Sequence, residues 1–402
     1  PDVVVVSTAI PDSNPEIAAA KAAGIPVLHR STALAELVEE HIGISVSGCH
    51  GKTTTTSMMT VVLQHVGVDP SFVIGSEMNE SGSNAHQGSG QHFVVEADES
   101  DGTFLALPTT AAIVTNIEPD HLNFWGTFDK LEQAYIDFMI KPQQRDGFTV
   151  TCGDDPGVAK VLPQVRQSGA RVITYGTGTE NDAVVELLPS ESVGCLFTVT
   201  YNGETLGPIQ LAVPGRHNAL NATATLITAV ELGCDVTRAI AGLEAYTGAH
   251  RRFEFRGQAH GVRVFDDIAH HPTEVDAVLK AARNVVGTGR VIIAFQAHHY
   301  YRTEMFMDEF AQALGLADFT VVLEIFAPGE TPIPGISGIV MASKVPLPAE
   351  QVVFEPSWSA VPQLLADQAQ PGDIIMTLGG SDIGMMCPQI IDLINQKFAD
   401  GN

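Results

Sequence analysis

The chain has 402 residues, enough for two to three domains with ample core. Its formal net charge of −26 argues strongly against nucleic acid as a partner, because binding a phosphate backbone needs a basic surface. No apolar stretch approaches the roughly 20 residues that cross a bilayer. The five scattered cysteines lack metal-ligand spacing and are typical of reduced thiols, so we expect a cytoplasmic protein without membrane insertion.

The first predicted elements form a β-α-β unit that ends near residue 41. It consists of a strand over 3–7, a helix over 14–23 and a strand over 26–28. The first strand begins almost at Pro1. We therefore expect earlier strands of a doubly wound domain, with a glycine-rich nucleotide-sugar loop, to precede this sequence.

A second predicted unit begins with the strand at Ile42. Further strands are expected at 93–95, 112–115 and 148–151, with a helix over 128–140 between the last two. The stretch 182–213 is predicted to form short antiparallel strands, and helices follow at 217–232 and 236–245.

After a predicted hinge at 246–252, strands and helices alternate to the end of the chain. Strands are expected at 262–265, 291–295, 320–325, 351–354 and 374–378, and helices at 272–284, 304–314, 357–369 and 388–398. This alternation predicts a mostly parallel, doubly wound sheet.

Residues 48–56 read Gly-Cys-His-Gly-Lys-Thr-Thr-Thr-Thr, directly after the apolar strand. Gly48 and Gly51 allow backbone N–H groups to point at phosphate oxygens, and Lys52 adds a positive charge. The hydroxyl of Thr53 would bind the Mg²⁺ that bridges the phosphates. The pattern is the short Gly-x-x-Gly-Lys-Thr form, and the alternative is a plain glycine turn before a threonine-rich helix. We predict an ATP site here.

Polar side chains follow the next two predicted strands at their ends. Glu96 and Glu99 come after one strand, and Asn116 and His121 come after the other. Carboxyl ends of parallel strands lie on the ligand side of a sheet, and Mg²⁺ prefers oxygen ligands. Glu96 is the first choice for a metal ligand and Glu99 the second. The alternatives are a solvated acidic loop and a histidine with no metal-binding role.

A third group of polar residues lies at a predicted helix start. Asn221 follows His217 and Asn218 by one helical turn, so the three share a face. Amide and imidazole groups suit a base edge and a ribose, although asparagine is also an ordinary N-cap.

Six motifs in this order resemble the Mur ligases of peptidoglycan synthesis, over essentially the whole chain. They cover residues 48–56, 96–101, 116–121, 215–222, 251–253 and 266–274. The resemblance implies an α/β architecture of three domains. Residues 1–41 would be a partial Rossmann-like domain for the UDP-sugar, residues 42–248 a P-loop ATPase-like domain with a mixed sheet, and residues 249–402 a doubly wound Rossmann-like domain for the amino acid.

The resemblance also implies the roles of individual residues. ATP would be bound by Gly48, Cys49, His50, Gly51, Lys52, Thr53, Thr54, Asn116, His217, Asn218, Asn221, Arg252 and Asp267. Thr53, Glu96 and His121 would hold the metal, and Lys52, Arg252 and His270 would be catalytic. Substrate contacts would come from Ser7 with the three residues after it, Asn14, Asn84, His86, His270, His298 and Arg302.

The activity that the resemblance implies is an ATP-dependent ligation with Mg²⁺. L-alanine would be joined to the lactyl carboxylate of UDP-N-acetylmuramate through an acyl phosphate, with release of ADP and phosphate. The alternatives are a ligase that attaches a whole tripeptide to the same sugar nucleotide, a weakened nucleotide-binding paralogue, and a P-loop kinase or NTPase. The sequence leaves the oligomeric state open.

Several positions depart from the family pattern, mostly in the last domain. Cys49 stands for a threonine, Ile268 for a tyrosine, His299 for an arginine and Phe326 for a tyrosine. Imidazole cannot bind a carboxylate through a planar fork as guanidinium does. Arg302 remains. Either these changes are tolerated, or they alter amino-acid binding, so the amino acid that is added stays open.

Overall fold

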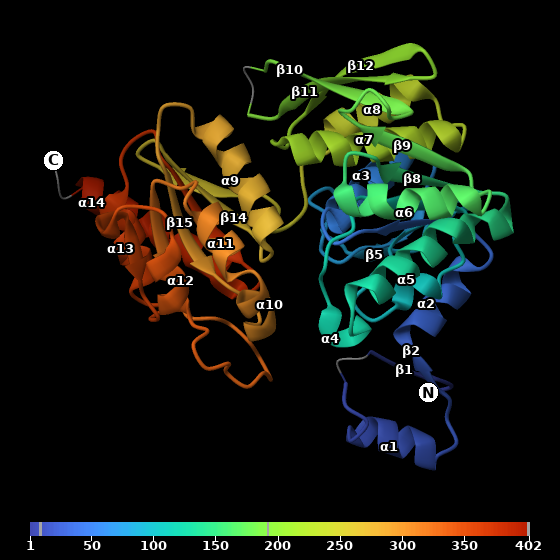
Figure 1. Cartoon of the computed structure of the whole chain (residues 1–402), viewed down its shortest axis with the longest axis horizontal. Coiled ribbons are helices and arrows are strands. Elements are labelled where there is room, and N and C mark those ends of the chain that lie inside the picture. The colour runs from blue at the N-terminus through green and yellow to red at the C-terminus, as the bar shows by residue number, and fades with distance from the viewer. Residues whose placement is uncertain (8–9, 191–192, 400–402) are drawn as a thin grey trace. The chain divides into compact units, whose positions relative to one another are not determined.

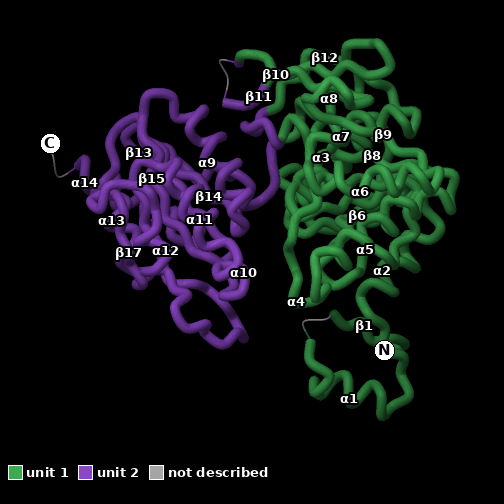
Figure 2. Tube along the Cα trace, viewed as in Figure 1, with its two compact units in different colours: residues 1–189, 196–211, 218–246 green, residues 190–195, 212–217, 247–402 purple. Residues whose placement is uncertain are grey.

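A computed structural model describes residues 1–7, 10–190 and 193–399 of the chain (Figure 1). The chain divides into two units (Figure 2). Unit 1 consists of residues 1–189, 196–211 and 218–246, and unit 2 of residues 190–195, 212–217 and 247–402. In the predicted UDP-sugar stretch that starts at Ser7, residues 8 and 9 lie outside the described part.

Unit 1 starts with the predicted β-α-β arrangement. Strands β1 and β2 pair in parallel, as a two-stranded sheet of their own. The side chain of Asn14 accepts a hydrogen bond from the N–H of Glu16, and Pro15 occupies the first helical position. Both features favour a helix start. The elements are β1 (Val4–Val6), α1 (Pro15–Ala22), β2 (Val27–His29) and α2 (Arg30–Val38).

The main sheet of unit 1 has ten strands among the described residues, in the order β12-β11-β10-β9-β8-β7-β3-β6-β4-β5. Strands β9, β8, β7, β3, β6 and β4 are parallel, whereas β10 and β11 pair antiparallel, as expected for 182–213. The strands are β3 (Ile42–Ser47), β4 (Ser71–Val73), β5 (Ala85–His86), β6 (His92–Glu96), β7 (Ala111–Val114), β8 (Phe148–Cys152), β9 (Val172–Gly176), β10 (Ala183–Leu188), β11 (Cys195–Tyr201) and β12 (Glu204–Leu211).

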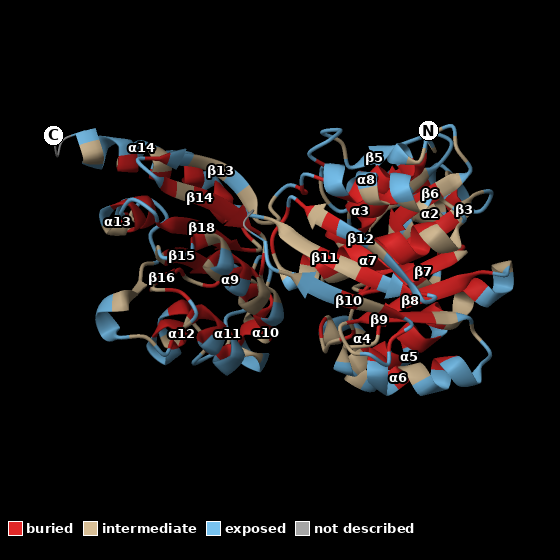
Figure 3. Cartoon of the chain, turned by 90° about the horizontal axis from the view of Figure 1, so that it is seen from above, coloured by how far each residue is buried: buried red, intermediate tan, exposed pale blue. Residues whose placement is uncertain are grey.

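Helices cover both faces of this mixed sheet (Figure 3). Apolar residues of α5 and α6 pack with β6 and β7 in one cluster, while α3 and α8 lie side by side on the other face. The helices are α3 (Lys52–His65), α4 (Leu122–Trp125), α5 (Phe128–Ile140), α6 (Pro156–Gln167), α7 (Arg216–Glu231) and α8 (Val236–Ala245), with 3₁₀ turns at Thr103–Leu105 and Lys141–Arg145. Buried strands that are apolar along their length carry the parallel core.

Unit 2 has a six-stranded sheet in the order β13-β14-β18-β15-β16-β17 within its described residues. All neighbours are parallel except β13, which pairs antiparallel with β14. The strands are β13 (Glu254–Ala259), β14 (Val262–Asp267), β15 (Val291–Gln296), β16 (Phe319–Val322), β17 (Val352–Phe354) and β18 (Ile374–Gly379). The expected strand over 320–325 therefore ends at Val322.

The helices of unit 2 also lie on both sheet faces, which makes the sheet doubly wound, as expected. One core cluster includes α9, α11 and α12, and a second includes α13 and α14 (Figure 3). The helices are α9 (Pro272–Val286), α10 (Tyr300–Met305), α11 (Met307–Leu314), α12 (Gly338–Lys344), α13 (Val361–Gln368) and α14 (Cys387–Ala399), with 3₁₀ turns at Ala349–Gln351 and Asp382–Met386. The helix expected over 304–314 is divided at Phe306, and no helix in the described ranges is long and apolar enough to cross a bilayer.

Candidate active site

The predicted phosphate loop joins the end of β3 to the start of α3. Gly48 and Gly51 both have positive φ, at 129° and 82°, which favours glycine. A Cβ atom on Gly48 would lie 2.0 Å from the Thr115 hydroxyl, so this position has no room for a side chain. Lys52 is the first residue of α3, and the N-terminal N–H groups of a helix form a site that favours an anion.

Lys52 is paired with Glu99, a residue that sequence reasoning placed second among metal ligands. The Lys52 Nζ atom lies 2.7 and 2.8 Å from the two Glu99 carboxylate oxygens and donates to the Gly48 carbonyl oxygen at 2.8 Å. Burial raises the pKa of Glu99 to about 7, against the opposing effect of Lys52. Burial would lower the pKa of Lys52, but Glu99 and Asp98 raise it overall. The loop therefore holds a charged lysine against a carboxyl group that can take up a proton near neutral pH.

Two of the three predicted metal ligands contact each other. The Thr53 hydroxyl donates to Glu96 Oε1 at 3.1 Å, and the Gly75 N–H donates to Glu96 Oε2 at 2.8 Å. The third, His121, lies with its Nε2 atom 3.6 Å from Asp120 Oδ2 and 3.8 Å from Glu99 Oε1. The structure thus joins Thr53 to Glu96 and sets His121 beside other carboxylates.

A cavity of about 320 Å³ adjoins Glu96, one of these oxygen ligands. Its polar lining comes from Glu96, Asp98, Thr103 and, from the helix α2, Arg30, and the rest of the lining is mostly apolar. The Thr103 hydroxyl is buried and has no hydrogen-bond partner within the described part of the chain. Hydroxyl and carboxylate oxygens beside such a cavity fit a hard divalent cation such as Mg²⁺.

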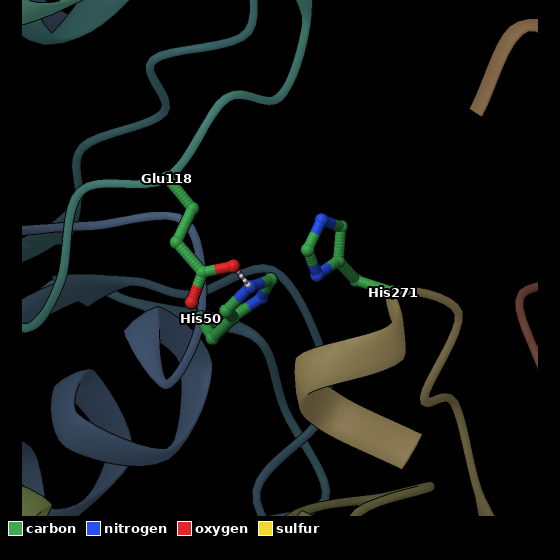
Figure 4. A group of neighbouring side chains, drawn as sticks. All are labelled: His50, Glu118 and His271. Atoms are coloured by element: carbon green, nitrogen blue, oxygen red, sulfur yellow. Dashed lines mark ion pairs between the residues drawn. The ribbon is translucent and has the colours of Figure 1, made fainter. Parts of the chain in front are cut away.

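The loop after β7 is bound tightly to the phosphate loop. The Asn116 side chain accepts from the His50 N–H at 2.8 Å and donates to the His50 carbonyl at 3.0 Å. The Cys49 thiol accepts from the Glu118 N–H at 3.1 Å and donates to the Glu118 carbonyl at 3.2 Å. The His50 ring forms an ion pair with Glu118 at 3.6 Å (Figure 4). Asn116 and Cys49 therefore position the backbone of both loops.

Helix α7 brings the predicted asparagines to the same region of unit 1. Asn218 and Asn221 are both buried. A Cβ atom on Gly51 would lie 2.8 Å from the Asn221 side-chain oxygen, so the absence of a side chain there allows this close approach. Thr54 is buried in the first turn of α3.

The other predicted contacts in unit 1 have local partners. Asn14 caps α1. The carbonyl oxygen of Asn84 accepts from the Ile74 N–H at 2.8 Å. His86, in β5, lies with Nε2 3.1 Å from Asp69 Oδ1. Ser7 is half-buried just after β1. Their substrate roles stay predictions.

A second group of titratable residues lies in unit 2, at the ends of β14 and β15. Asp267 accepts hydrogen bonds from the N–H groups of Phe253 and Ala269, both at 2.7 Å. Burial raises the pKa of Asp267 to about 6, although Arg252 opposes the shift. Burial and then Arg252 lower the pKa of His217 to about 4. His217 is therefore neutral at physiological pH.

His270 lies in the turn between β14 and α9. Its Nδ1 atom is 2.8 Å from the Ile268 carbonyl oxygen. A carbonyl can only accept, so this contact assigns the proton to Nδ1 and leaves Nε2 as the basic nitrogen. The next residue, His271, is the N-cap of α9 (Figure 4).

The remaining predicted residues of unit 2 surround the His298 ring. That ring lies 5.9 Å from the His270 ring and 3.9 Å from the His299 ring, between centroids. Burial first, and then the charges of His299, His270 and Arg302, lower the pKa of His298 to about 3. Arg302 is buried and lies over the Tyr301 ring. His270, His298 and Arg302 thus form one group, and their substrate roles stay predictions.

His299, which stands for the family's arginine, is held by a residue that the sequence did not single out. Its Nδ1 atom lies 2.5 Å from Glu330 Oε1, and Glu330 Oε2 accepts from the Tyr300 N–H at 2.7 Å. No motif surrounds Glu330, so no local signal could have identified it.

The fold and these two groups define a class: nucleotide-binding α/β proteins with a phosphate loop and an additional doubly wound domain. Comparisons with known proteins identify the family. The Mur ligase middle domain matches residues 46–229, the Mur ligase glutamate ligase domain matches 251–380, and the Mur ligase family catalytic domain matches 1–42. The chain belongs to the Mur ligase family.

Individual relatives indicate which members of the family this chain is similar to. The UDP-N-acetylmuramate–L-alanine ligase of Acidothermus cellulolyticus is 50% identical over 398 residues, which are 99% of this chain and 83% of the relative. The crystal structure of the UDP-N-acetylmuramate–alanine ligase from Thermotoga maritima has a TM-score of 0.81 at 25% identity, covering 100% of this chain and 86% of that one. The MurF ligase of Thermotoga maritima, in complex with ADP, shows the same fold, with a TM-score of 0.73 at 17% identity over 98% of this chain and 94% of that one.

Proposed function

We propose that the protein is an ATP-dependent ligase that joins L-alanine to the lactyl carboxylate of UDP-N-acetylmuramate, releasing ADP and phosphate. The observation that carries this proposal is the 50% identity, over 99% of the chain, to a ligase of that name. The reaction supplies a precursor of peptidoglycan. Because ATP and the sugar nucleotide are cytoplasmic compounds and the cysteines are free thiols, we place the protein in the cytoplasm.

The first chemical step is activation of the carboxylate. The lactyl carboxylate oxygen attacks the γ-phosphorus of ATP, which forms an acyl phosphate and breaks the bond to ADP. Lys52 and the N-terminus of α3 stabilise the negative charge on the transferred group. We assign the other phosphate-loop residues, 48–54, to binding the triphosphate through their backbone.

We assign the divalent cation to Thr53, Glu96 and His121. Thr53 and Glu96 already share a hydrogen bond, beside the cavity described above. When bound, Mg²⁺ would neutralise phosphate oxygens. The remaining nucleotide contacts are assigned to Asn116, Asn218 and Asn221 of unit 1 and to His217, Arg252 and Asp267 of unit 2. Arg252 is also assigned to the γ-phosphate.

The second step is attack of the amine on the acyl carbon, with phosphate as the leaving group. The amine must be neutral to attack, so a base has to accept its proton. His270 suits this role because its Nδ1 atom is engaged with the Ile268 carbonyl and Nε2 is the basic nitrogen. We assign the amino-acid carboxylate to Arg302, beside His298. Residues 1–41, 42–248 and 249–402 would then serve the UDP-sugar, ATP and the amino acid.

A phosphate-release assay tests the proposal. Release is expected only with ATP, UDP-N-acetylmuramate and an amino acid together, and L-alanine should give the highest kcat/KM in a panel of alanine, glycine, serine and a tripeptide. EDTA should abolish release and added Mg²⁺ should restore it. Activity with the tripeptide alone would favour a recycling ligase instead. ATP binding without release under any of these conditions would contradict ligase function.

A further inference from the structure

Glu274, in the first turn of α9, contacts the turn that carries the proposed base. Its Oε2 atom accepts hydrogen bonds from the backbone N–H groups of His270, at 3.0 Å, and of His271, at 3.3 Å. With His271 it forms a capping box, in which the third helical residue reaches back to the N-cap backbone. The side chain is 12% exposed. Glu274 therefore fixes the turn that carries His270.

The same carboxylate also faces the charged groups around it. Glu274 Oε2 lies 3.6 Å from His270 Nδ1, and Oε1 lies 3.9 Å from an Arg252 guanidinium nitrogen. On another side, the His298 ring meets the His270 ring edge-on, 5.9 Å away. Asp267 and His217 also lie within electrostatic range of both Arg252 and Glu274. His270 thus has a carboxylate on one side and an imidazole on the other.

We propose that Glu274 is a positioning residue for the amine step, holding the His270 ring in place and stabilising its protonated form. This inference rests on the proposed ligase function. In the step, the amine nitrogen forms a bond to the acyl carbon, its proton moves to His270 Nε2, and phosphate leaves with the electrons of the broken bond. The imidazolium that results lies beside the Glu274 carboxylate, which lowers its energy as the carboxylate of a catalytic triad does.

The variant Glu274→Gln distinguishes the effect of the negative charge from the effect of helix capping. The side-chain oxygen of glutamine can accept the same two N–H bonds, so Glu274→Gln should keep the helix start and the fold. It removes the negative charge beside the imidazole, which favours the protonated form in the native chain. Asp235→Asn is the matched control, because Asp235 caps α8 through the Arg238 N–H at 2.9 Å and belongs to none of the groups described.

The first measurement is the pKa of His270, followed by NMR in protein with labelled histidine and assigned with His270→Asn. It does not depend on turnover. We expect Glu274→Gln to lower this pKa by about one unit and Asp235→Asn to leave it unchanged. An unchanged pKa in Glu274→Gln would overturn the inference, whether or not the chain is a ligase.

The second measurement is the pH profile of kcat/KM for the amino acid. In Glu274→Gln the acidic limb should move to lower pH by the same amount, and kcat should fall about tenfold. Glu274→Asp, a shorter carboxylate, should recover part of kcat. If Glu274→Gln shifts the pKa but keeps the native profile and rate, the positioning role is wrong. If the native protein has no turnover, the proposed function fails, while the NMR result still decides the electrostatic contact.

Discussion

The two groups of site residues are built in different ways. In unit 1 the phosphate loop is positioned mainly by backbone: two glycines with positive φ, and side chains that bond to main-chain atoms of the neighbouring loop. In unit 2 the candidate amino-acid site consists of side chains on separate turns, three of them histidines, such as His298 and His299. The phosphate loop agrees with the family pattern almost throughout, and the candidate amino-acid site departs from it.

This difference follows from what each region must do. A phosphate is bound by backbone N–H groups, which every residue except proline has, so the requirement falls on backbone geometry. Only glycine meets this requirement where a Cβ would collide. A carboxylate that is bound by side chains can be bound by several residue types, with different affinities. His299 with Glu330 illustrates such a replacement.

The largest effect is expected for the region built on backbone. Lys52→Ala should lower phosphate release by about 10³-fold, because it removes the charge that stabilises the transferred phosphoryl group. The fold should persist, since Glu99, whose pKa is already raised to about 7, can take up a proton when it loses its partner. Release should be measured with all substrates saturating, and stability by urea denaturation.

A second variant controls for the charge that Lys52→Ala leaves buried. Lys52→Ala/Glu99→Gln should be at least as stable as Lys52→Ala and equally inactive. Turnover within tenfold of the native rate in either variant would remove the phosphate loop from the mechanism.

A smaller effect is expected in unit 2 from pH. His217 has a pKa of about 4 in the folded chain, below its unfolded value of about 6.5. A base with a lowered folded pKa contributes stability above the unfolded pKa, and this contribution is lost as pH falls toward the folded pKa. Between pH 7.5 and pH 5 the loss should be about 2 kcal/mol. His217→Asn should reduce the pH dependence by that amount.

Fluorescence can report on this unit separately. The chain has two tryptophans, Trp125 in unit 1 and Trp358 in unit 2, so a Trp125→Phe background isolates the second. Urea curves for both proteins at pH 7.5 and pH 5 give the comparison. An equal loss of stability with and without His217 would show that other groups titrate instead.

The smallest effect concerns His299. His299→Arg should lower the KM for L-alanine by up to about tenfold, because a guanidinium can bind a carboxylate through two hydrogen bonds. Glu330 could retain the new arginine, so His299→Arg/Glu330→Gln is the matched variant. An unchanged KM in both variants would show that His299 does not weaken binding of the amino acid. The candidate amino-acid site would then be as functional as the phosphate loop, despite its departures from the family pattern.

Much of the fold could be predicted where local signals agree. The helix expected over 128–140 has those bounds, because an amphipathic run follows Thr127, whose hydroxyl caps the Lys130 N–H. Helix α6 was not predicted, since Gly157 and Pro163 indicate breaks, although Asp155 caps its start. Strand β13 was also missed, because it is an edge strand with charged residues and a bulge at Gly257.

The candidate site shows the same limit. Its phosphate loop is contiguous in sequence, so its residue types and spacing indicate the chemistry directly. The pairs Lys52–Glu99 and His299–Glu330 join residues that are 47 and 31 positions apart, and no periodicity links them. Only the fold brings such partners together, which is why the sequence placed Glu99 second and did not single out Glu330.

The thiol in the phosphate loop has a consequence for inhibition. Burial raises the pKa of Cys49 well above its usual value, and Glu99 adds to the shift. The thiolate is the form that reacts with alkylating and oxidising reagents, and this environment makes it scarce. A covalent drug aimed at the Cys49 sulfur would therefore react slowly. Nucleotide binding should likewise persist under oxidative stress that modifies exposed cysteines.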